Sequence, residues 1–353
     1  MTIARYHITP LSSLSTPLMS DTIFGHFCWF LYYCKGESFL QDFLGQYGNG
    51  KAAPVLFSSA FPAGRLPRPA LPPLTRKQAR QFVADKFETN SDLPDHIKNL
   101  SGRHKRLIGM NALKSWQKHQ FMGIEDFTAL QNDFRETDLY ERLFWQYRQN
   151  NGKMDNNGDG TNEVSAGNSI SRITGTVNRE SGGLYTREKT WFPPDTHLDL
   201  YVTATSEENH SDVDRFLTEF LPSYGFGKDK SVGMGHLQVA RDEAFQAEIF
   251  NCKTANARMA LSLTAFTGMG EHETFYHLTT KFGKLGGDFA FSSPTGGPPR
   301  PFKKPLLMMM PGAVFMTSEP LDRHALVDNI HSDSRIKHCG IPLTVPLNIQ
   351  EAG

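Results

Sequence analysis

A glycine-rich segment that also carries lysines has the clearest chemical potential in the sequence. It reads Gly-Phe-Gly-Lys-Asp-Lys-Ser-Val-Gly-Met-Gly over residues 225–235. Glycine lets a backbone approach a ligand closely, and lysine side chains beside it can reach phosphate groups. The segment therefore predicts a loop that holds a nucleic-acid backbone, with these residues in contact: Gly225, Gly227, Lys228, Lys230, Ser231 and Gly233.

The position of this segment along the chain separates it from the nucleotide-cofactor motifs. A dinucleotide fingerprint runs from a strand through glycines into a helix, and a P-loop also enters a helix. Here the segment follows a predicted helix and precedes a predicted strand, so we expect no cofactor. The alternative is a turn whose lysines are simply solvated.

Two histidines raise the alternative of acid–base catalysis. His7 lies in the first predicted strand and His26 in the first predicted helix, and two histidines suffice for metal-independent RNA cleavage. Each also fits a structural role, since His26 lies among apolar helix residues and His7 in an alternating strand. His272, Glu273 and His277 lack the spacing of a zinc-protease helix.

An acidic loop resembles part of a calcium-binding loop. Asp155, Asn157 and Asp159 occupy its first, third and fifth positions. The twelfth position is Ala166, where such a loop needs a bidentate glutamate. We therefore expect the segment up to Glu163 to be a flexible polar loop, without a metal site.

The composition describes a globular chain without overall charge. It has 353 residues, 37 Lys and Arg, 37 Asp and Glu, 39% hydrophobic residues and four cysteines without a CxxC pair. The length suits two or three globular units, and the cysteines favour neither disulfides nor zinc. The apolar run 27–34 is too short to cross a bilayer, and the N-terminus has no secretory pattern. We expect a cytoplasmic protein with no membrane partner.

The charge is unevenly distributed along the chain. Residues 65–118 hold twelve Lys and Arg against four Asp and Glu, whereas residues 125–163 hold nine acids against four bases. Local patches of this kind attract polyanions even when the net charge is zero. The alternatives are a phosphate-binding region and a solvated helical insertion.

The elements that must position these residues follow the order β-α-β-β-α-β. We predict a strand at 3–8, a helix capped by Ser20, and a hairpin formed by 183–192 and 197–205. A helix capped by Ser211 and ended by Pro222 follows, and then a strand at 236–240. The fold class is α+β, and this order is the ferredoxin-like, RRM-type order, which leaves one sheet face open to RNA.

Two further regions complete the predicted domain organisation. Residues 37–180 form an insertion with helices near 75–87 and 133–147 and a loop at 150–167. A second, β-rich unit follows, with strands predicted at 259–265, 275–282, 306–310 and 313–317. We predict an N-terminal domain over 1–245 and a C-terminal, also ferredoxin-like domain over 246–353.

Several segments, in order along nearly the whole chain, resemble one protein family. They are Leu18-Met-Ser-Asp-Thr-Ile-Phe-Gly25, Ala60-Phe-Pro-Ala-Gly-Arg-Leu-Pro-Arg-Pro69, Asn168-Ser-Ile-Ser-Arg-Ile-Thr-Gly175 with Gly183-Leu-Tyr185, the 225–235 loop, and Lys281-Phe-Gly-Lys-Leu-Gly-Gly287 with Phe302-Lys-Lys-Pro305. The chain is similar to the RAMP superfamily of CRISPR-associated proteins. Within it, the chain resembles the type III-A (Csm) subunits that cap the 5′ end of the guide RNA.

The resemblance implies a function. It implies two ferredoxin-like domains, binding of the repeat-derived 5′ tag of the guide RNA (crRNA), and a role in antiviral defence without catalysis. Its implied partners are the large polymerase-like type III subunit and an adjacent backbone RAMP subunit. The open alternatives are a crRNA-processing ribonuclease of the same superfamily, the equivalent type III-B subunit, and a protein scaffold.

The resemblance also suggests which residues contact RNA. Ser20 and Thr22 lie at the start of the first helix, where free N–H groups favour phosphate, although an ordinary cap is the alternative. Arg172 and Thr174 resemble the part of the family that touches the guide backbone. Tyr185 is a candidate for base stacking, with a core position as the alternative.

Five further basic residues complete the predicted RNA-binding set. Arg65 and Arg68 belong to a proline-rich extended stretch, which we expect to present them to solvent and not to bury them. The others extend a basic surface in the second half of the chain: Lys284, Lys303 and Lys304.

Overall fold

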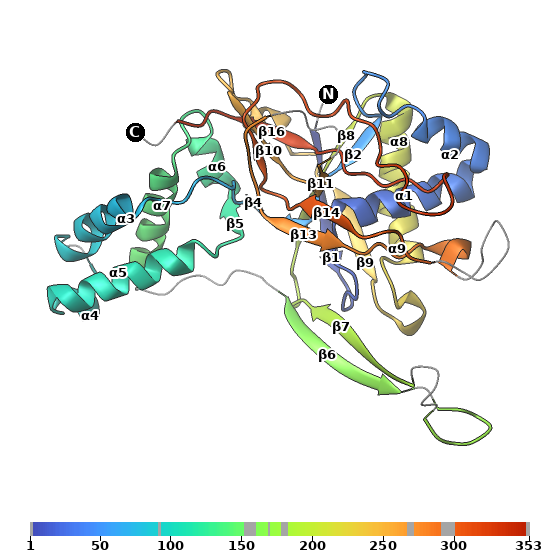
Figure 1. Cartoon of the computed structure of the whole chain (residues 1–353), viewed down its shortest axis with the longest axis horizontal. Helices are drawn as coiled ribbons and strands as arrows, with labels where there is room; N and C mark the ends of the chain where they lie inside the picture. Colours follow the sequence, from blue (N-terminus) through green and yellow to red (C-terminus); the bar gives the residue numbers. More distant parts are fainter. Residues whose placement is uncertain are drawn as a thin grey trace.

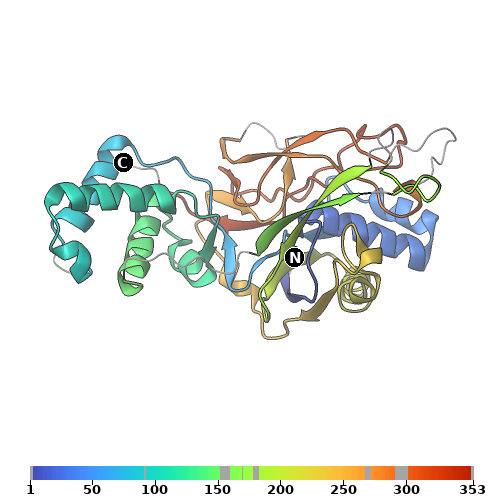
Figure 2. The same ribbon diagram turned by 90° about the horizontal axis from the view of Figure 1, so that it is seen from below.

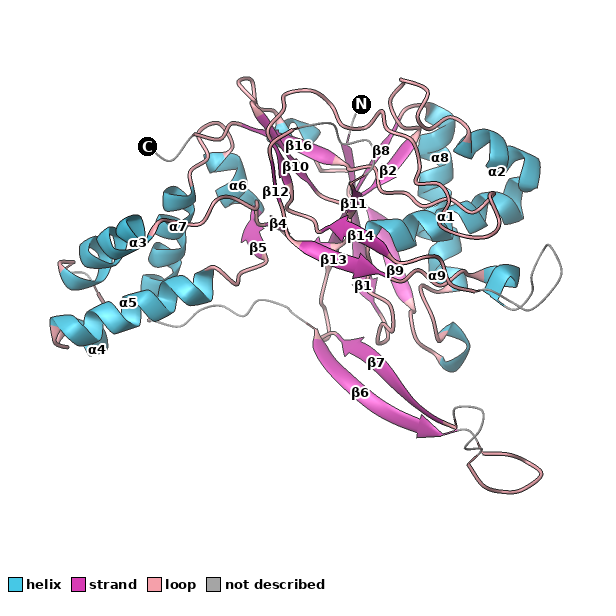
Figure 3. Ribbon diagram, in the orientation of Figure 1, coloured by secondary structure: helices cyan, strands magenta, loops and turns pink. Residues whose placement is uncertain are grey.

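A body with two projections makes up the molecule in this computed structural model (Figure 1). The structure describes residues 3–90, 93–151, 160–168, 170–177, 183–266, 272–290 and 301–350. A helical lobe projects from one side of the body, and a two-stranded hairpin projects from another (Figures 1 and 3). The chain is thus a mixed α/β protein with several antiparallel sheets, as the sequence predicts.

The N-terminal sheet is antiparallel, with the strand order β2-β8-β1-β9. Its strands are β1 (Ile3–Pro10), β2 (Val55–Phe57), β8 (Leu198–Ala204) and β9 (Leu237–Arg241), and β3 (Phe61–Pro62) also pairs with β8. Two helices, α1 (Ser20–Lys35) and α8 (Glu207–Arg215), contribute to the core beneath it. Tyr6 and Ile8 of β1 are buried on this side, and the Tyr6 hydroxyl donates a hydrogen bond to Asp214 of α8. His7 and Thr9 therefore point to the opposite face of the sheet.

The predicted hairpin of residues 183–192 with 197–205 is wrong. β7 (Leu184–Trp191) pairs instead with β6 (Thr161–Asn168), which lies partly within the predicted loop at 150–167. The second strand of the N-terminal unit is β2, a short and fully buried strand that the sequence pattern did not reveal. Alternating polar residues on both faces of β7 do not specify a partner, because no hydrophobic face fixes the pairing.

The helix ends also differ from prediction. The N-cap of α1 is Met19, without a side-chain cap, and the Ser20 hydroxyl accepts a hydrogen bond from the Leu263 amide at 2.9 Å. α8 begins earlier than predicted, because Ser206 caps it through the Asn209 amide. Its axis continues through a π-helix, η2 (Phe216–Phe220), into α9 (Leu221–Tyr224). Pro222 is tolerated because the π-helical turn before it alters the i→i−4 hydrogen bonding that a proline inside an α-helix would interrupt.

The inserted lobe contains the helices predicted for it. Its elements are α3 (Arg76–Val83), η1 (Ala84–Glu88), α4 (Asp95–Lys98), α5 (Gly102–Trp116), α6 (Ile124–Leu130) and α7 (Glu136–Gln149). Thr75 and Gln78 form a capping box at the start of α3. Aromatic side chains fill the lobe, with Phe87 against Phe144 and Trp116 stacked near Tyr140. β4 (Arg65–Pro67) and β5 (Phe121–Gly123) pair where the lobe leaves the body, and α2 (Glu37–Leu44) packs beside α1.

The second half of the chain is rich in short strands, as predicted. They are β10 (Ala257–Ala260), β11 (Thr264–Ala265), β12 (Thr274–Phe275), β13 (Leu278–Lys281), β14 (Leu306–Met309), β15 (Val314–Phe315) and β16 (Thr344–Leu347). They form two antiparallel sheets of order β12-β15-β10-β16 and β11-β14-β13. The sequence pattern missed β16. In the described part of this half, the helical turns are η4 (Ala247–Phe250) and η5 (Gly287–Ala290), both 3₁₀.

One hydrophobic core connects the two halves. Met259, Leu261 and Val345 belong to the same buried cluster as Tyr6 and Phe27. The boundary between residues 245 and 246 stays a prediction, as does the ferredoxin-like nature of each half. In either case the second half helps to hold the helix α1 in place.

Candidate nucleic-acid interface

The glycine-rich loop is closely tied to the rest of the body. The Gly227 amide donates a hydrogen bond to His26 Nε2 at 3.0 Å, and the Lys228 amide donates to Thr16 Oγ1 at 3.1 Å. The Gly235 amide donates to the Ser13 carbonyl at 2.9 Å. Much of this backbone is therefore already bound by the protein itself.

Glycine is required in this loop for internal packing. Gly227 and Gly235 both have positive φ, and a Cβ on Gly235 would lie 2.0 Å from the Phe226 carbonyl oxygen. A Cβ on Gly227 would lie 2.6 Å from the Thr16 Cβ. Gly233 differs, because it also has positive φ but a Cβ there would meet no atom of a described, non-adjacent residue within 4 Å. Of these three glycines, Gly233 is the one whose backbone leaves room for a ligand.

The two loop lysines have different environments. Lys228 is exposed, whereas the Lys230 ammonium lies 3.4 Å from the centroid of the Tyr224 ring. Burial lowers the pKa of Lys230 to about 8. Ser231 is exposed on the 3₁₀ turn η3 (Lys230–Val232). The predicted phosphate contacts are thus available from Lys228 and Ser231 and in part from Lys230.

His26 connects helix α1 to this loop. Its Nε2 accepts the Gly227 amide, and its Nδ1 is buried with no hydrogen-bond partner among the described residues. Burial, and secondarily the Lys230 charge, lowers the pKa of His26 to about 3. A neutral imidazole in this position supports the loop and has no accessible proton to exchange.

The hairpin β6–β7 forms an arm with one aromatic and basic face. Side chains alternate along a strand, so Tyr185, Arg187, Lys189 and Trp191 share one face of β7. The Arg187 guanidinium lies 5.0 Å from the Tyr185 ring centroid, and the Lys189 ammonium lies 5.2 Å from the Trp191 ring centroid. We call these four residues the aromatic–basic face.

The residues of β6 that pair with this face differ along the arm, and the Tyr185 ring lies over a glycine near the outer end. Gly167 pairs with Tyr185, and a Cβ there would lie 2.6 Å from the tyrosine ring. Nearer the body, Glu163 accepts a hydrogen bond from the Trp191 indole at 2.6 Å and pairs with Lys189 at 3.2 Å. At the base of the arm, the Glu163 carboxylate therefore offsets the charge of Lys189. Arg187 forms no such ion pair with a described residue.

The tip of the arm carries two of the predicted RNA contacts. An isolated bridge joins Ile170 to Val177, and between them Arg172 and Thr174 are exposed. Ile173 at the tip is 96% exposed. The structure thus places the predicted residues Arg172, Thr174 and Tyr185 on one arm. Sequence reasoning missed Arg187 and Trp191, although the alternation of aromatic and basic residues over 185–191 could have revealed them.

The arm has little support from the body. The backbones of Leu14 and Thr190 exchange two hydrogen bonds at its base, of 2.9 and 2.8 Å. Most of its residues are exposed on both faces, and a two-stranded hairpin of this kind is only marginally stable alone. Exposed aromatic and apolar side chains on such an arm point to a binding partner.

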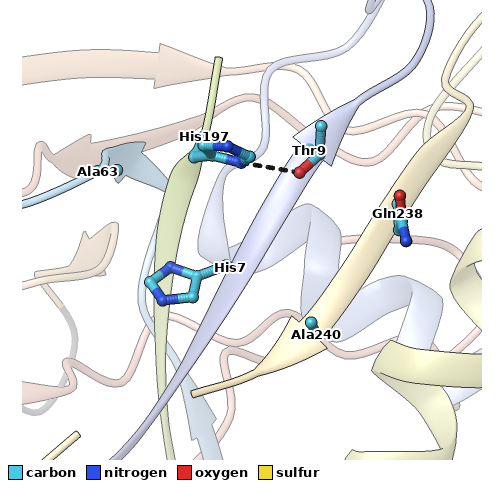
Figure 4. A pocket seen from close by; sticks show the side chains of 6 residues that line it. All are labelled: His7, Thr9, Ala63, His197, Gln238 and Ala240. Carbon is cyan, nitrogen blue, oxygen red and sulfur yellow. Dashed lines mark hydrogen bonds between the residues drawn. The ribbon is translucent and has the colours of Figure 1, made fainter. Parts of the chain in front are cut away.

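A pocket lies on the face of the N-terminal sheet opposite the helices (Figure 4). His7, Thr9 and His197 line it, together with Gln238 and Ala240, and its volume is about 410 Å³. His7 Nδ1 lies 2.8 Å from Asp199 Oδ1, and His197 Nδ1 lies 2.9 Å from Thr9 Oγ1. This sheet face is therefore not a flat open surface.

The first turn of α1 is directed at the protein interior. Ser20 is buried between the Leu263 amide and the Ser59 hydroxyl, and Thr22 accepts a hydrogen bond from Lys281 at 3.1 Å. Asp21 pairs with the same lysine at 3.0 Å. Backbone from the second half thus takes the place that a phosphate was predicted to fill at Ser20.

The expectation that both arginines of the proline-rich stretch are presented to solvent is wrong for Arg68. Its side chain is 10% exposed and donates hydrogen bonds to the Trp116 carbonyl and to Glu136. The guanidinium also lies 5.1 Å from the Tyr140 ring centroid. Arg65 is half-buried in β4. The proline-rich segment lies against the lobe, where a carboxylate and an aromatic ring compensate the desolvation of Arg68.

The three lysines of the second half do not share one environment. Lys284 and Lys304 are exposed. Lys303 is directed inward, its ammonium donates to the Lys337 carbonyl at 2.8 Å, and burial lowers its pKa. Its role is therefore mainly to satisfy backbone within the second half.

The metal-binding alternatives are limited by what the structure describes. Asp155 to Asp159 lie outside the described residues, and Glu163 lies in strand β6. Over the described ranges, no group of three or more histidine, cysteine, aspartate or glutamate side chains is arranged to hold a metal ion. Within the same ranges, no helix combines the length and the apolar character needed to span a bilayer.

Comparisons with known proteins place this fold. No protein-family model matches the sequence, and no curated protein sequence matches it. A crystal structure of a Csm3–Csm4 subcomplex of the type III-A CRISPR–Cas interference complex matches 98% of this chain and 99% of that chain, with a TM-score of 0.55 and 12% identity. A Csm1–Csm4 cassette in complex with pppApA matches 99% and 100%, with a TM-score of 0.53 and 12% identity.

The matches show which fold this chain shares. This chain and the matched structures share one architecture, a mixed α/β chain with several antiparallel sheets. Csm4 is the component shared by the matched assemblies, and the likeness to it extends over the full length of both chains. At 12% identity this likeness establishes the fold.

Proposed function

We propose that this protein is a non-catalytic RNA-binding subunit of a type III-A CRISPR effector complex that acts in antiviral defence in the cytoplasm. It binds the repeat-derived 5′ tag of the crRNA and docks to the large polymerase-like subunit and to an adjacent backbone RAMP subunit. The full-length likeness to Csm4 supports these partners, because the matched structures contain Csm4 with Csm1 and with Csm3.

The aromatic–basic face of the arm is the observation that carries the RNA-binding proposal. Bases stack on aromatic rings, and arginine contributes both charge and planar stacking. Tyr185 and Trp191 are 39% and 45% exposed, so their rings are accessible. With Arg172 at the tip, the arm offers stacking surfaces and phosphate-binding groups on one element.

The geometry gives no support to a ribonuclease that uses His7 and His26 together. His7 faces the pocket on one side of the sheet, and His26 belongs to the helix on the other side. His7 also contacts two carboxylates, with Asp199 at 2.8 Å and Asp242 at 3.3 Å. The two imidazoles therefore cannot act on one scissile bond, and we propose no catalytic role for either.

A second surface fits the proposed docking to protein partners. Exposed apolar side chains lie on and around β13 and β14, where a solvated sheet would carry polar residues: Tyr276, Leu278, Phe282, Phe302 and Leu307. We call them the β13–β14 patch. Large exposed apolar patches are typical of protein interfaces. We propose that this patch contacts the large subunit.

We also propose the ferredoxin-like interpretation for both halves. In the first half, the strand order β2-β8-β1-β9 and the chain order β-α-β-β-α-β support it. In the second half, support comes from its antiparallel sheets alone. An experimental structure that showed no paired α-helices in residues 246–353 would contradict the second assignment.

The decisive experiment is to purify the intact complex and to identify the RNA and proteins that accompany this chain. We expect a crRNA whose 5′ tag crosslinks to residues of the arm. We also expect Phe282→Glu to weaken copurification of the large subunit while the isolated chain keeps its affinity for tag RNA. Crosslinks of the 5′ tag to other subunits only would contradict the proposal, and a type III-B large subunit in the complex would assign the chain to that system.

A further inference from the structure

The helical lobe carries a set of basic side chains that no other part of the described chain neutralises. Two cations of residues 75–118 are ion-paired, Lys86 with Glu141 and Arg106 with Glu88, each at 2.8 Å. Eight others form no ion pair with a described residue: Arg76, Lys77, Arg80, Lys98, Arg103, Lys105, Lys114 and Lys118. We call these eight residues the lobe basic set.

The periodicity of α5 directs Arg103 and Lys114 outward, whereas Lys105 is half-buried. Ala112, Leu113 and Trp116 are buried on one side of the helix. Arg103 and Lys114 lie eleven residues apart, which is close to three helical turns, so they share the exposed side. Lys118 follows the end of the helix and is also exposed.

The basic residues of α3 belong to the same unit of structure. α3 and η1 lie against α5, since a Cβ on Gly109 would lie 2.7 Å from Val83 and 2.9 Å from Phe87. Arg76, Lys77 and Arg80 are exposed on α3. α4 and the N-terminal end of α5 lie at the end of the lobe farthest from the body, and α5 runs from there back toward β5 (Figures 1 and 2).

Asp85, Glu88 and Asp95 lie on η1 and α4 among the basic residues, and the other described acidic residues of the lobe lie on and beside α6 and α7. Asp126, Asp138 and Glu141 line a surface cavity between α6 and α7. The α6 end is also the attached end, because Gln131 donates hydrogen bonds to the Phe250 and Pro346 carbonyls, both at 2.8 Å. Acidic residues are thus more numerous on the α6–α7 side of the lobe, and cations without an ion pair among the described residues lie on the α3–α5 side. Such a separation of charge attracts a polyanion to the α3–α5 side.

We propose that the lobe basic set binds the phosphate backbone of RNA that extends beyond the 5′ tag. RNA as the ligand class rests on the function proposed above. Lysines and arginines on solvated helix faces neutralise phosphates without reading bases, so this contact is independent of sequence. A protein partner fits less well, because an interface core needs aromatic and apolar anchors. Among the described residues of 76–118, the exposed large apolar residues are only Leu107 on α5 and Leu100 just before this helix.

The test compares two triple variants of the full chain that remove the same charges. The lobe variant carries Arg103→Gln, Lys114→Gln and Lys118→Gln. The control carries Lys51→Gln, Lys253→Gln and Arg323→Gln, three exposed cations outside the lobe and the arm. The probes are the copurifying crRNA at full length and the same RNA trimmed to its 5′ tag, each titrated over a range of salt concentrations.

We expect the lobe variant to bind full-length crRNA more weakly, with a salt slope lower by about 2 units for three single-strand phosphate contacts. Binding of the trimmed tag and both measurements on the control are expected to stay at wild-type values. An unchanged slope for full-length crRNA, or a lobe variant that loses an acidic protein instead of RNA, overturns this inference. If the arm variants described below still weaken tag binding, the proposed function stands without it; if neither set affects RNA, the proposed function fails as well.

Discussion

The sequence predicts RNA contacts in both the glycine-rich loop and the β6–β7 arm, but the structure gives the two regions different environments. In the loop, the amides of Gly227, Lys228 and Gly235 donate hydrogen bonds to neighbouring protein atoms. In the arm, Tyr185 and Arg172 are exposed, and among the described residues the backbone hydrogen bonds to the body lie at its base, between Leu14 and Thr190. The loop is packed against the body by its own backbone hydrogen bonds, and the arm is an exposed surface.

This difference shows where binding groups are to be sought in such a chain. A positive φ or a close backbone approach indicates that glycine is needed, but it does not say whether the neighbour is a ligand or the protein itself. Exposed aromatic and basic side chains on a marginal hairpin are harder to explain by stability alone. We therefore assign more RNA-binding free energy to the arm than to the loop.

The largest effect is expected from Gly235→Ala, which tests whether the glycine-rich loop is needed for packing within the body. The new Cβ would meet the Phe226 carbonyl oxygen at 2.0 Å, so we expect a loss of roughly 3 kcal/mol or more in the free energy of unfolding. Gly233→Ala is the matched control, because it has the same sign of φ but open space. Its cost is expected to be about 1–2 kcal/mol, from the left-handed backbone alone. Equal losses in urea denaturation would contradict the packing difference.

The next effect concerns the arm and RNA affinity. Tyr185→Ala combined with Arg187→Ala removes one stacking surface and one cation, and we expect tag RNA to bind about 30-fold more weakly, since stacking on one aromatic ring contributes about 1–3 kcal/mol. The control variant, Leu184→Ala with Thr186→Ala, changes the opposite face of the same strand. Fluorescence anisotropy with the tag RNA measures both. If the two variants bind alike, the aromatic–basic face is not the RNA contact.

A pH experiment tests whether the hydrogen bond between His26 and the glycine-rich loop stabilises the fold. The pKa of His26 is lowered to about 3 in the folded protein, below its usual value, so the unfolded chain takes up the proton first. Stability from the neutral imidazole is present near pH 7 and is lost as the pH falls below about 6.5, at about 1.4 kcal/mol per unit. We expect wild type to lose about 2 kcal/mol more than His26→Gln between pH 7 and pH 5. Parallel pH dependences would show that His26 is not the cause.

A smaller effect is expected from the loop lysines. Replacing Lys228 and Lys230 by alanine removes two cations from an otherwise intact loop, and we expect the salt slope of tag binding to fall by about 1–2 units at neutral pH. Because the pKa of Lys230 is lowered to about 8, its contribution should decrease as the pH rises through 8. An unchanged slope would mean that the loop has a structural role and does not contact RNA.

No effect on RNA cleavage is expected from replacing the histidines considered for catalysis. Wild type and the variants His7→Ala, His26→Ala and His197→Ala should all leave repeat RNA intact, with or without added metal. Gel analysis of end-labelled repeat RNA measures this. Specific cleavage by wild type that His7→Ala or His197→Ala abolishes would assign a ribonuclease to the pocket on the sheet face.

Local signals in the sequence were sufficient for much of the fold. Alternation and helical periodicity predicted β1, α1 and β9, and the helix expected near 75–87 is present as α3 and η1. The β-rich character of the second half was also evident from its short apolar runs. These features depend on residues close together in the sequence, so a single sequence contains them.

Partner choice between distant segments could not be obtained in this way. β7 pairs with β6 and β8 pairs with β2, because pairing depends on which faces become buried in the complete fold. Arg68 was expected at the surface, but the carboxylate of Glu136 and the ring of Tyr140, some seventy residues away, make its burial possible.

The candidate site divides along the same line. The sequence by itself determined that Arg172, Thr174 and Tyr185 are near one another in the chain and suited to RNA, and that 65–118 is basic. Only the tertiary structure decided that Ser20 is covered by the second half, that Lys303 is directed inward, and that Lys114 and Arg103 remain exposed. The physical reason is that a polar side chain binds a ligand only where the fold leaves it without an internal partner, and such partners come from segments that are distant in the sequence.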